Sequence, residues 1–221
     1  MDLYEYVCLS SFQITRREHS EVKVLLRDDV TLPILGKDEH GYILCLAKPR
    51  KMRNDKMSYL GLLFDSNDLL HKVLLWRIFK ASMCHLSLHV VASDFEAYAD
   101  WSKDKDVDLA IYAAKMAEDA VARAYLKTFC SPFIIDTVFA NIVSYLTMKP
   151  FHMILNDTLR VMAAVLSGFS VGLNKGELDE KTQKGVNDSV SALCGLENIV
   201  HKEFLDSAKA RNEDETLTHY E

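Results

Sequence analysis

The chain has 221 residues, of which 49% are hydrophobic and 26% charged, so it is long and apolar enough to bury a core. Its formal net charge of −6 argues against nucleic acid as the main partner, because binding to phosphates needs a basic face. None of the five cysteines has CxxC spacing and their number is odd, which favours reduced thiols in a cytoplasmic protein. Charged residues and histidines interrupt the apolar stretches, so we expect no membrane span.

Residues 20–60 are rich in short β-prone runs, which are separated by turn-like polar segments. The runs lie at 22–26, 30–35 and 42–46. Pro33 falls inside the second run, and proline is tolerated mainly at the edge of a sheet. We therefore predict a small antiparallel sheet near the N-terminus, with the second run as an edge strand.

From Asp65 onward the pattern becomes helical. The polar stretch 65–68 is suited to cap a helix over 69–91, whose apolar residues cover most of its circumference, so this helix should be buried. Further helices are expected at 107–129, 132–148, 150–168 and 180–210, the last with a break near Gly195.

These elements predict an α+β fold that is predominantly helical, with the small sheet packed on five or six helices. We expect a single globular domain over residues 1–210. It would consist of a β-rich part at 20–60 and a helical part at 65–210, followed by a polar tail at 211–221.

Three residues are candidates for a metal site. His85 and His89 are four residues apart on the expected helix 69–91, so both imidazoles lie on one face and can meet one ion. Glu118 lies on the apolar face of the alanine-rich helix 107–129, where a carboxylate needs a cation, a donor or a metal as partner. We predict that the three converge. A metal-free cluster of hydrogen bonds between the histidines and the acid is the favoured interpretation, because core histidines bonded to carboxylates are commoner than metal sites. A site for a divalent metal such as zinc or iron and a chance spacing of unconnected residues are the alternatives, and Glu96 is a second candidate acid if the first helix continues that far.

No catalytic residue is predicted. A zinc peptidase of the HExxH type needs a glutamate directly after its first histidine, and here that position is Leu86, which cannot activate water. The chain also contains no GxSxG, Walker or GxGxxG motif. A basic run at 48–56 is either a patch for phosphate or an acidic partner, or a solvated loop.

The order of motifs resembles a known family. A β-prone run is followed by Leu75-Trp76-Arg77 and HxxxH, then by Tyr98-Ala99-Asp100-Trp101, then by Ala117-Glu118-Asp119. Over about 30–127 this is similar to the zincin-like amino-terminal region of von Willebrand A domain proteins, such as scaffold subunits of cobalt chelatases and nitric-oxide-reductase activation proteins. The resemblance implies His85, His89 and Glu118 as the metal ligands, and an AAA+ ATPase or a von Willebrand A domain protein as partner. Leu86 departs from the peptidase pattern, and no von Willebrand A domain fits into the remaining residues.

Three functions follow as hypotheses. The first is a non-catalytic, zincin-like interaction or assembly module of a larger cytoplasmic complex, with a protein partner or a second copy of the chain. The second is a metal-dependent enzyme, a hydrolase or an oxidoreductase, that uses His85, His89 and an acid. The third is a helical subunit that binds a cofactor or small molecule, with the basic run 48–56 facing a phosphate.

Overall fold

The computed structural model describes residues 2–18 and 20–218, with the side chains of residues up to 211. The chain divides into two compact units. Unit 1 consists of Met1–Val91 and Pro132–Ala140, and unit 2 of Ala92–Ser131 and Asn141–Glu221. We expected residues 1–210 to form one globular domain. Whether the two units form one domain stays a prediction.

Unit 1 contains the predicted sheet near the N-terminus. Its strands are β1 (Val22–Arg27), β2 (Ile34–Asp38) and β3 (Gly41–Ala47), in the order β1-β3-β2. β2 and β3 form an antiparallel hairpin, but β1 pairs with β3 in parallel, so the sheet is mixed and not purely antiparallel. The reason is that β3 inserts between the two strands that precede it in the chain. β2 lies at an edge, as Pro33 predicts, and begins directly after that proline.

A second small sheet follows, which the sequence did not predict as strands. It is antiparallel and consists of β4 (Arg50–Lys51), β5 (Lys56–Tyr59) and β6 (Leu62–Asp65). The basic run 48–56 therefore forms β4, a turn and the start of β5. Asn54 and Asp55 make this turn with positive φ values of 58° and 53°, which these two residue types tolerate better than most.

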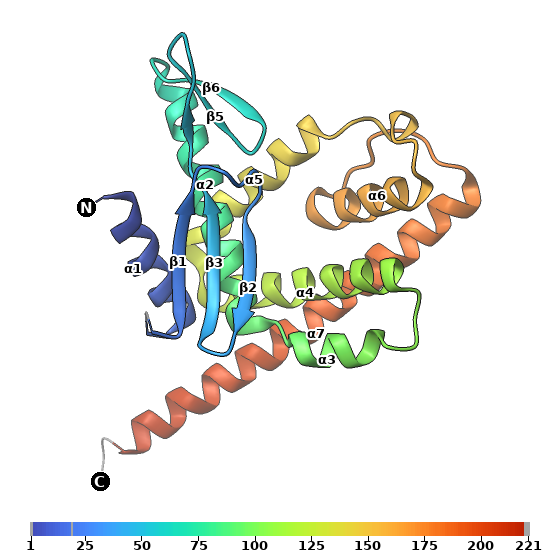
Figure 1. Cartoon of the computed structure of the whole chain (residues 1–221). Coiled ribbons are helices and arrows are strands. Elements are labelled where there is room, and N and C mark those ends of the chain that lie inside the picture. Colours follow the sequence, from blue (N-terminus) through green and yellow to red (C-terminus); the bar gives the residue numbers. More distant parts are fainter. Residues whose placement is uncertain (1, 19, 219–221) are drawn as a thin grey trace. The chain divides into compact units, whose positions relative to one another are not determined.

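Two helices complete most of unit 1. α1 (Leu3–Thr15) begins with a capping box in which Asp2 accepts from the backbone of Glu5 and the Glu5 side chain accepts from the backbone of Asp2. Figure 1 shows α1 beside β1, which it contacts. α2 (Leu69–Ala92) buries ten residues, as expected of the central helix, although its first turn is exposed.

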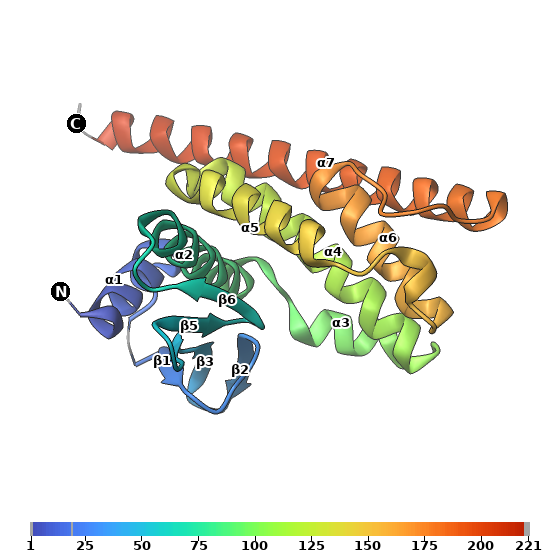
Figure 2. The same ribbon diagram turned by 90° about the horizontal axis from the view of Figure 1, so that it is seen from above.

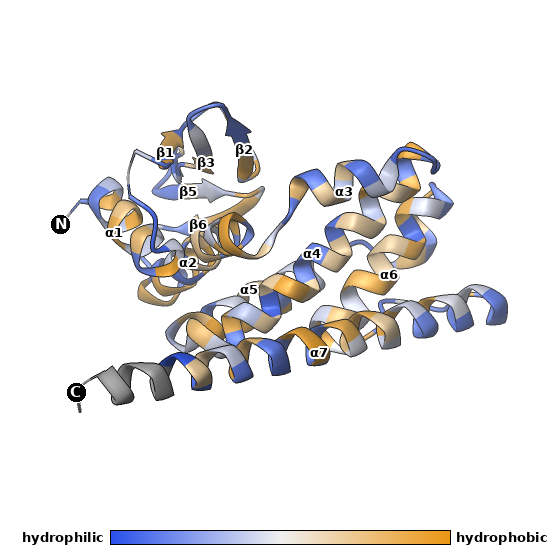
Figure 3. Ribbon diagram, turned by 90° about the horizontal axis from the view of Figure 1, so that it is seen from below, coloured by the Kyte–Doolittle hydropathy of each residue, from blue (hydrophilic) through white to orange (hydrophobic). Residues whose placement is uncertain are grey.

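Unit 2 is helical. Its helices are α3 (Phe95–Ser102), α4 (Val107–Phe129), α6 (Asp157–Val171) and α7 (Glu180–Thr218), and it shares α5 (Ile134–Thr147) with unit 1. α4 and α6 both contact α7, and Figure 2 shows them on one side of it. A small core of Phe151, Ala164, Val165 and Val186 lies in this unit. Hydrophilic and hydrophobic residues alternate along α7 (Figure 3), which passes through Gly195 without the predicted break.

The predicted fold class is confirmed, because the described residues form seven α-helices and two small sheets. The helix over 107–129 has the predicted bounds, and those predicted at 69–91 and 132–148 lie within two residues of the observed ones. The helix predicted at 150–168 instead begins at Asp157, because Asn156 caps it and a separate 3-10 turn, Phe151–Met153, precedes it. α1 was not predicted, and α7 is longer than predicted. The backbone of the expected polar tail is helical to Thr218, and residues 219–221 lie outside the described chain. No single described helix is long and apolar enough to cross a membrane, although α4 and the segment 131–147, taken together as a bent pair, have the length and composition for it.

Candidate metal centre

The two predicted histidines meet on α2. His85 and His89 are one helical turn apart, and their Nε2 atoms lie 3.2 Å from each other. The rings are nearly perpendicular, with an interplanar angle of 89° and centroids 4.5 Å apart. Two nitrogens bound to one tetrahedral zinc ion at about 2.0–2.1 Å lie about 3.3–3.4 Å from each other. The observed separation therefore suits a shared ion, and it suits equally a hydrogen bond between two neutral imidazoles.

The histidine pair lies on the accessible face of α2. His85 is exposed and His89 is half-buried, whereas their neighbours Cys84, Leu86 and Leu88 are buried. The sequence led us to expect the histidines on a mostly buried helix; the helix is buried, but this face is open. Ser82, one turn before His85, donates its hydroxyl to the carbonyl of Ile78 at 2.9 Å. Because His85 is exposed, an ion from solution can reach the two imidazoles. Two imidazoles together with one carboxylate form a group of ligands that can hold a divalent metal.

Position 86 has no catalytic group. The Leu86 side chain is buried, with an exposed fraction of 5%, and belongs to the core face of α2. A general base must be within hydrogen-bond reach of the water that it activates, and leucine has no atom that accepts a proton.

The predicted acid, Glu118, lies on α4 and its side chain is buried. Its negative charge acts on Tyr98: burial is the main reason that the pKa of Tyr98 is raised, and the Glu118 carboxylate adds to the effect. The next residue, Asp119, is half-buried. Because α4 belongs to unit 2 and α2 to unit 1, the convergence of Glu118 with the histidines stays a prediction.

Glu96, the second candidate acid, is not on the helix that carries the histidines. α2 ends at Ala92, and Asp94 starts a new helix by accepting from the backbone of Ala97 at 3.0 Å. The condition for Glu96 to share the face of His85 and His89, a first helix that continues to residue 96, is therefore not met. The cause is the cap at Asp94, whose side chain competes for the backbone donors that a continuous helix would use.

Two buried acids that the sequence did not single out form ionic clusters. In unit 1, Asp136 of α5 lies 2.9 Å from Arg77 and 2.6 Å from Lys80, both on α2. In unit 2, Glu197 of α7 pairs with Arg123 and Lys127 of α4. In both clusters, the two cations are three or four residues apart on one helix and share one buried carboxylate. These are structural ion pairs, since each acid is already satisfied by two cations.

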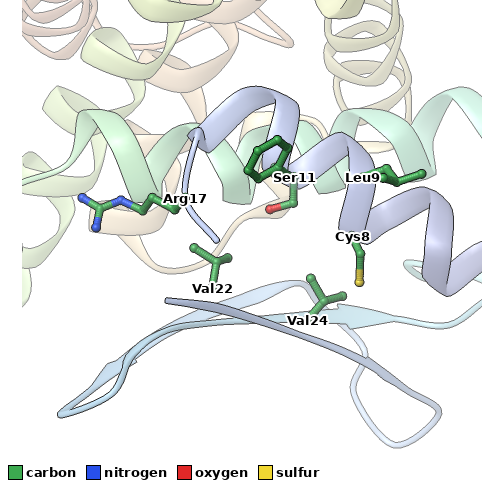
Figure 4. Close-up of a pocket in the computed structure, with 7 residues that line it drawn as sticks. Cys8, Leu9, Ser11, Arg17, Val22 and Val24 are labelled. Carbon is green, nitrogen blue, oxygen red and sulfur yellow. The ribbon is translucent and has the colours of Figure 1, made fainter. Parts of the chain in front are cut away.

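A hollow between α1 and β1 has a volume of about 210 Å³. It is lined mostly by apolar side chains, with the thiol of Cys8 and the hydroxyl of Ser11 (Figure 4). The guanidinium of Arg17 points away from Val24 and Cys8 in this view, and it pairs with Glu21 and lies over the ring of Tyr42. The hollow is smaller than the roughly 300–1,000 Å³ of ordinary ligand pockets, so it gives the hypothesis of a cofactor-binding subunit little support.

A second hollow, of about 590 Å³, bears on the same hypothesis. Its lining includes Lys23 and Lys48, the latter at the start of the basic run, but it also includes the acidic Asp2 that caps α1. The cap already uses the N-terminal end of that helix and places a negative charge there, which disfavours a phosphate. The histidine pair therefore remains the arrangement with the most specific chemistry.

Comparisons of the chain with protein-family models, with curated proteins and with solved structures find no match. The resemblance to the zincin-like region of von Willebrand A domain proteins therefore stays a prediction. What can be argued about function rests on the geometry of the described residues.

Proposed function

We propose that this chain is a non-catalytic binding module that carries a divalent metal ion on His85 and His89. The observation that carries the proposal is the 3.2 Å separation of the two Nε2 atoms, which matches two ligands of one tetrahedral ion. Both imidazoles are held by the same rigid helix, so little conformational freedom is lost when an ion binds.

A carboxylate would complete the site. The sequence predicts Glu118, and its neighbour Asp119 is the alternative on the same helix. Two histidines and one carboxylate are a common ligand set for zinc, and they are also the set of non-haem iron(II) sites. Zinc and iron are therefore the ions to test first.

The site lacks the general base of an HExxH peptidase. Leu86 stands where a peptidase of the HExxH type has its base, and its side chain belongs to the core of unit 1. A metal bound there would then stabilise the fold or an assembly, because the free energy of metal binding adds to the free energy of folding. A metal-dependent hydrolase is the competing function, and chelator-sensitive cleavage of casein by the purified chain would establish it in place of ours.

An apolar stripe on α5 supports a role in assembly. Ile135, Val138, Ile142 and Leu146 are spaced by three or four residues, so they share one face of the helix, and all four are exposed. The only charged residue of α5 is Asp136, which is buried in its ionic cluster. Two copies of such a stripe can pair without bringing like charges together, so we propose a second copy of this chain as the occupant. An AAA+ ATPase or a von Willebrand A domain protein, which the resemblance implies, remains a further proposed partner.

Metal analysis tests the site. We expect the purified chain to contain, or to take up, about one zinc or iron per molecule, and the double variant His85→Ala/His89→Ala to lose at least tenfold in affinity. His152→Ala is the matched control, since His152 is an exposed histidine of unit 2. Glu118→Gln and Asp119→Asn, measured separately, identify the acid. Metal binding that is equal in the double variant and the wild type would overturn the proposal.

Light scattering tests the assembly. We expect Ile142→Glu/Leu146→Glu to convert a dimer to a monomer, while Leu155→Glu, at an exposed leucine outside α5, leaves the dimer intact. A wild-type chain that is monomeric at about 100 µM would contradict pairing through α5.

A further inference from the structure

The end of the basic run 48–56 is bonded to the segment that leads into α2. The backbone carbonyl of Asp55 accepts from both the backbone and the hydroxyl of Ser66, each at 2.7 Å. The carboxylate of Asp55 also accepts from the side chain of Asn67 at 3.2 Å. These bonds place the β4–β5 turn beside the start of α2. We call the surface that they create the basic tip, and it consists of Arg50, Lys51, Met52, Arg53, Leu69, Leu70 and Lys72.

The apolar members of the basic tip are open to solvent. Leu69 is 76% exposed, Leu70 63% and Met52 48%. In the sequence, Met52 lies between Lys51 and Arg53, Lys72 follows the two leucines, and all three cations and Arg50 are exposed. Large apolar side chains that stand this far out of a protein surface among cations are typical of segments that enter the boundary between lipid headgroups and acyl chains.

Segments 50–56 and 65–72 contain five cations and three acids, so the acids reduce the positive charge of this region without cancelling it. Asp65 pairs with Lys56 at 3.1 Å and accepts from the backbone of Asn67, which lowers its pKa. Asp68 accepts from the first backbone N–H groups of α2, at 2.7 Å from that of Leu70. Within the described chain, Lys51, Arg53 and Lys72 form no ion pair, so their charges are available to an external anion.

We propose that the basic tip docks unit 1 on an anionic lipid surface. Its charge is complementary to acidic headgroups, and its leucines and methionine can insert beside them. None of the hollows described above is lined by these three apolar residues, whereas a protein partner with acidic anchors would be expected to use a pocket. A basic and apolar surface that lines neither hollow therefore fits a bilayer better than it fits an acidic protein. This surface is separate from the histidine pair, and the inference does not depend on the proposed metal.

Co-sedimentation of the full chain with vesicles tests the inference. We expect binding to vesicles of phosphatidylcholine with about 30% phosphatidylserine, weak binding to phosphatidylcholine alone, and loss of binding at high salt. Lys51→Gln/Arg53→Gln should weaken binding about 30-fold, because each basic residue at an anionic surface contributes about 1 kcal/mol. Leu69→Ser/Leu70→Ser should weaken it about tenfold or more, through loss of apolar insertion.

Two control variants match these changes elsewhere. Lys149→Gln removes an exposed lysine and Leu155→Ser an exposed leucine, both in unit 2, and both should bind like the wild type. Circular dichroism melts verify that all variants fold. The inference is overturned if the wild type does not bind the anionic vesicles, or if the charge and leucine variants bind them as well as the wild type does. It is likewise overturned if the chain binds polyglutamate but not vesicles, which would indicate an acidic protein partner.

Discussion

The carboxylate of Asp136 lies 2.6 Å from the ammonium group of Lys80 although the two residues are far apart in the sequence. The same carboxylate bonds to Arg77 through its other oxygen, and its side chain is almost completely buried. Since α2 supplies both cations and the start of α5 supplies the acid, this cluster attaches α5 to α2 within unit 1.

Asp136→Asn should therefore destabilise the protein. Removing one partner of a buried ion pair costs about 3–5 kcal/mol, and we expect the lower end because Arg77 and Lys80 keep partial access to water. Chemical denaturation gives the free energy of unfolding. Asp157→Asn is the control, because Asp157 is 88% exposed in its pair with Arg160 and should contribute less than about 0.5 kcal/mol. Equal effects of the two substitutions would show that the Asp136 cluster is not a buried pair.

Leu75→Ala or Ile78→Ala should cost about 2–5 kcal/mol each. Both side chains are buried in α2, with exposed fractions of 9% and 5%, and truncation would leave cavities. Val73→Ala, at a 41% exposed position of the same helix, should change the free energy of unfolding by less than about 0.5 kcal/mol. Small, similar losses in all three variants would mean that this face of α2 is not a core.

Two glycines should respond to alanine in opposite directions. Gly41 has a φ of 137°, and a Cβ there would lie 2.2 Å from the backbone oxygen of Glu21, which accepts from the N–H of Tyr42. Gly41→Ala should therefore destabilise by about 2 kcal/mol or more. Gly195 lies within α7 with open space around it, so Gly195→Ala should stabilise by about 0.5–1 kcal/mol. Thermal melts measured side by side give the two signs, and a loss at position 195 would argue against a continuous α7.

Stability should fall at alkaline pH because of Tyr59. Burial raises the pKa of Tyr59 to about 12, against an ordinary value of 10.0, and the nearby Ser82 opposes this only in part. The unfolded chain loses this proton above about pH 10 while the folded chain keeps it. The contribution is therefore complete below pH 10 and is lost as the pH rises toward 12, amounting to about 2–3 kcal/mol. Tyr59→Phe lacks the titrating group, so the difference in unfolding free energy between the variant and the wild type should grow over this range. A constant difference from pH 9 to 12 would contradict the assignment.

Local patterns predicted most of the helices. α2 and α4 have long stretches without glycine or proline, and polar residues such as Asp106 cap their starts, so their bounds were readable. α1 was missed because its apolar and small polar residues do not form a clear one-sided stripe, although the capping box of Asp2 and Glu5 was a usable signal. The parallel pairing of β1 with β3 was not predictable. β2 separates these two strands in the sequence, so their pairing depends on contacts between residues that are distant in the chain.

In the candidate site, too, local relationships could be predicted from the sequence and long-range ones could not. The histidine pair was predictable, since an i, i+4 spacing on a helix fixes the relation of two side chains. The ionic cluster of Arg77 with Asp136 was not, because 59 residues separate the partners and many exposed acids were equally plausible. The choice of Glu118 as the third ligand is of this second, long-range kind, and it therefore needs the metal-binding measurements.

The order in which the ribosome delivers the chain matters for this fold. Unit 1 includes the segment Pro132–Ala140, which is made only after the whole of Ala92–Ser131, the first part of unit 2. At about 5–20 residues per second, those roughly 40 residues delay the arrival of Asp136 by about 2–8 s. During that interval Arg77 and Lys80 lack their carboxylate, so the nascent unit 1 is incomplete. A fragment that ends at Val91 lacks the segment 132–140 permanently. It should therefore be more sensitive to protease than unit 1 in the full chain.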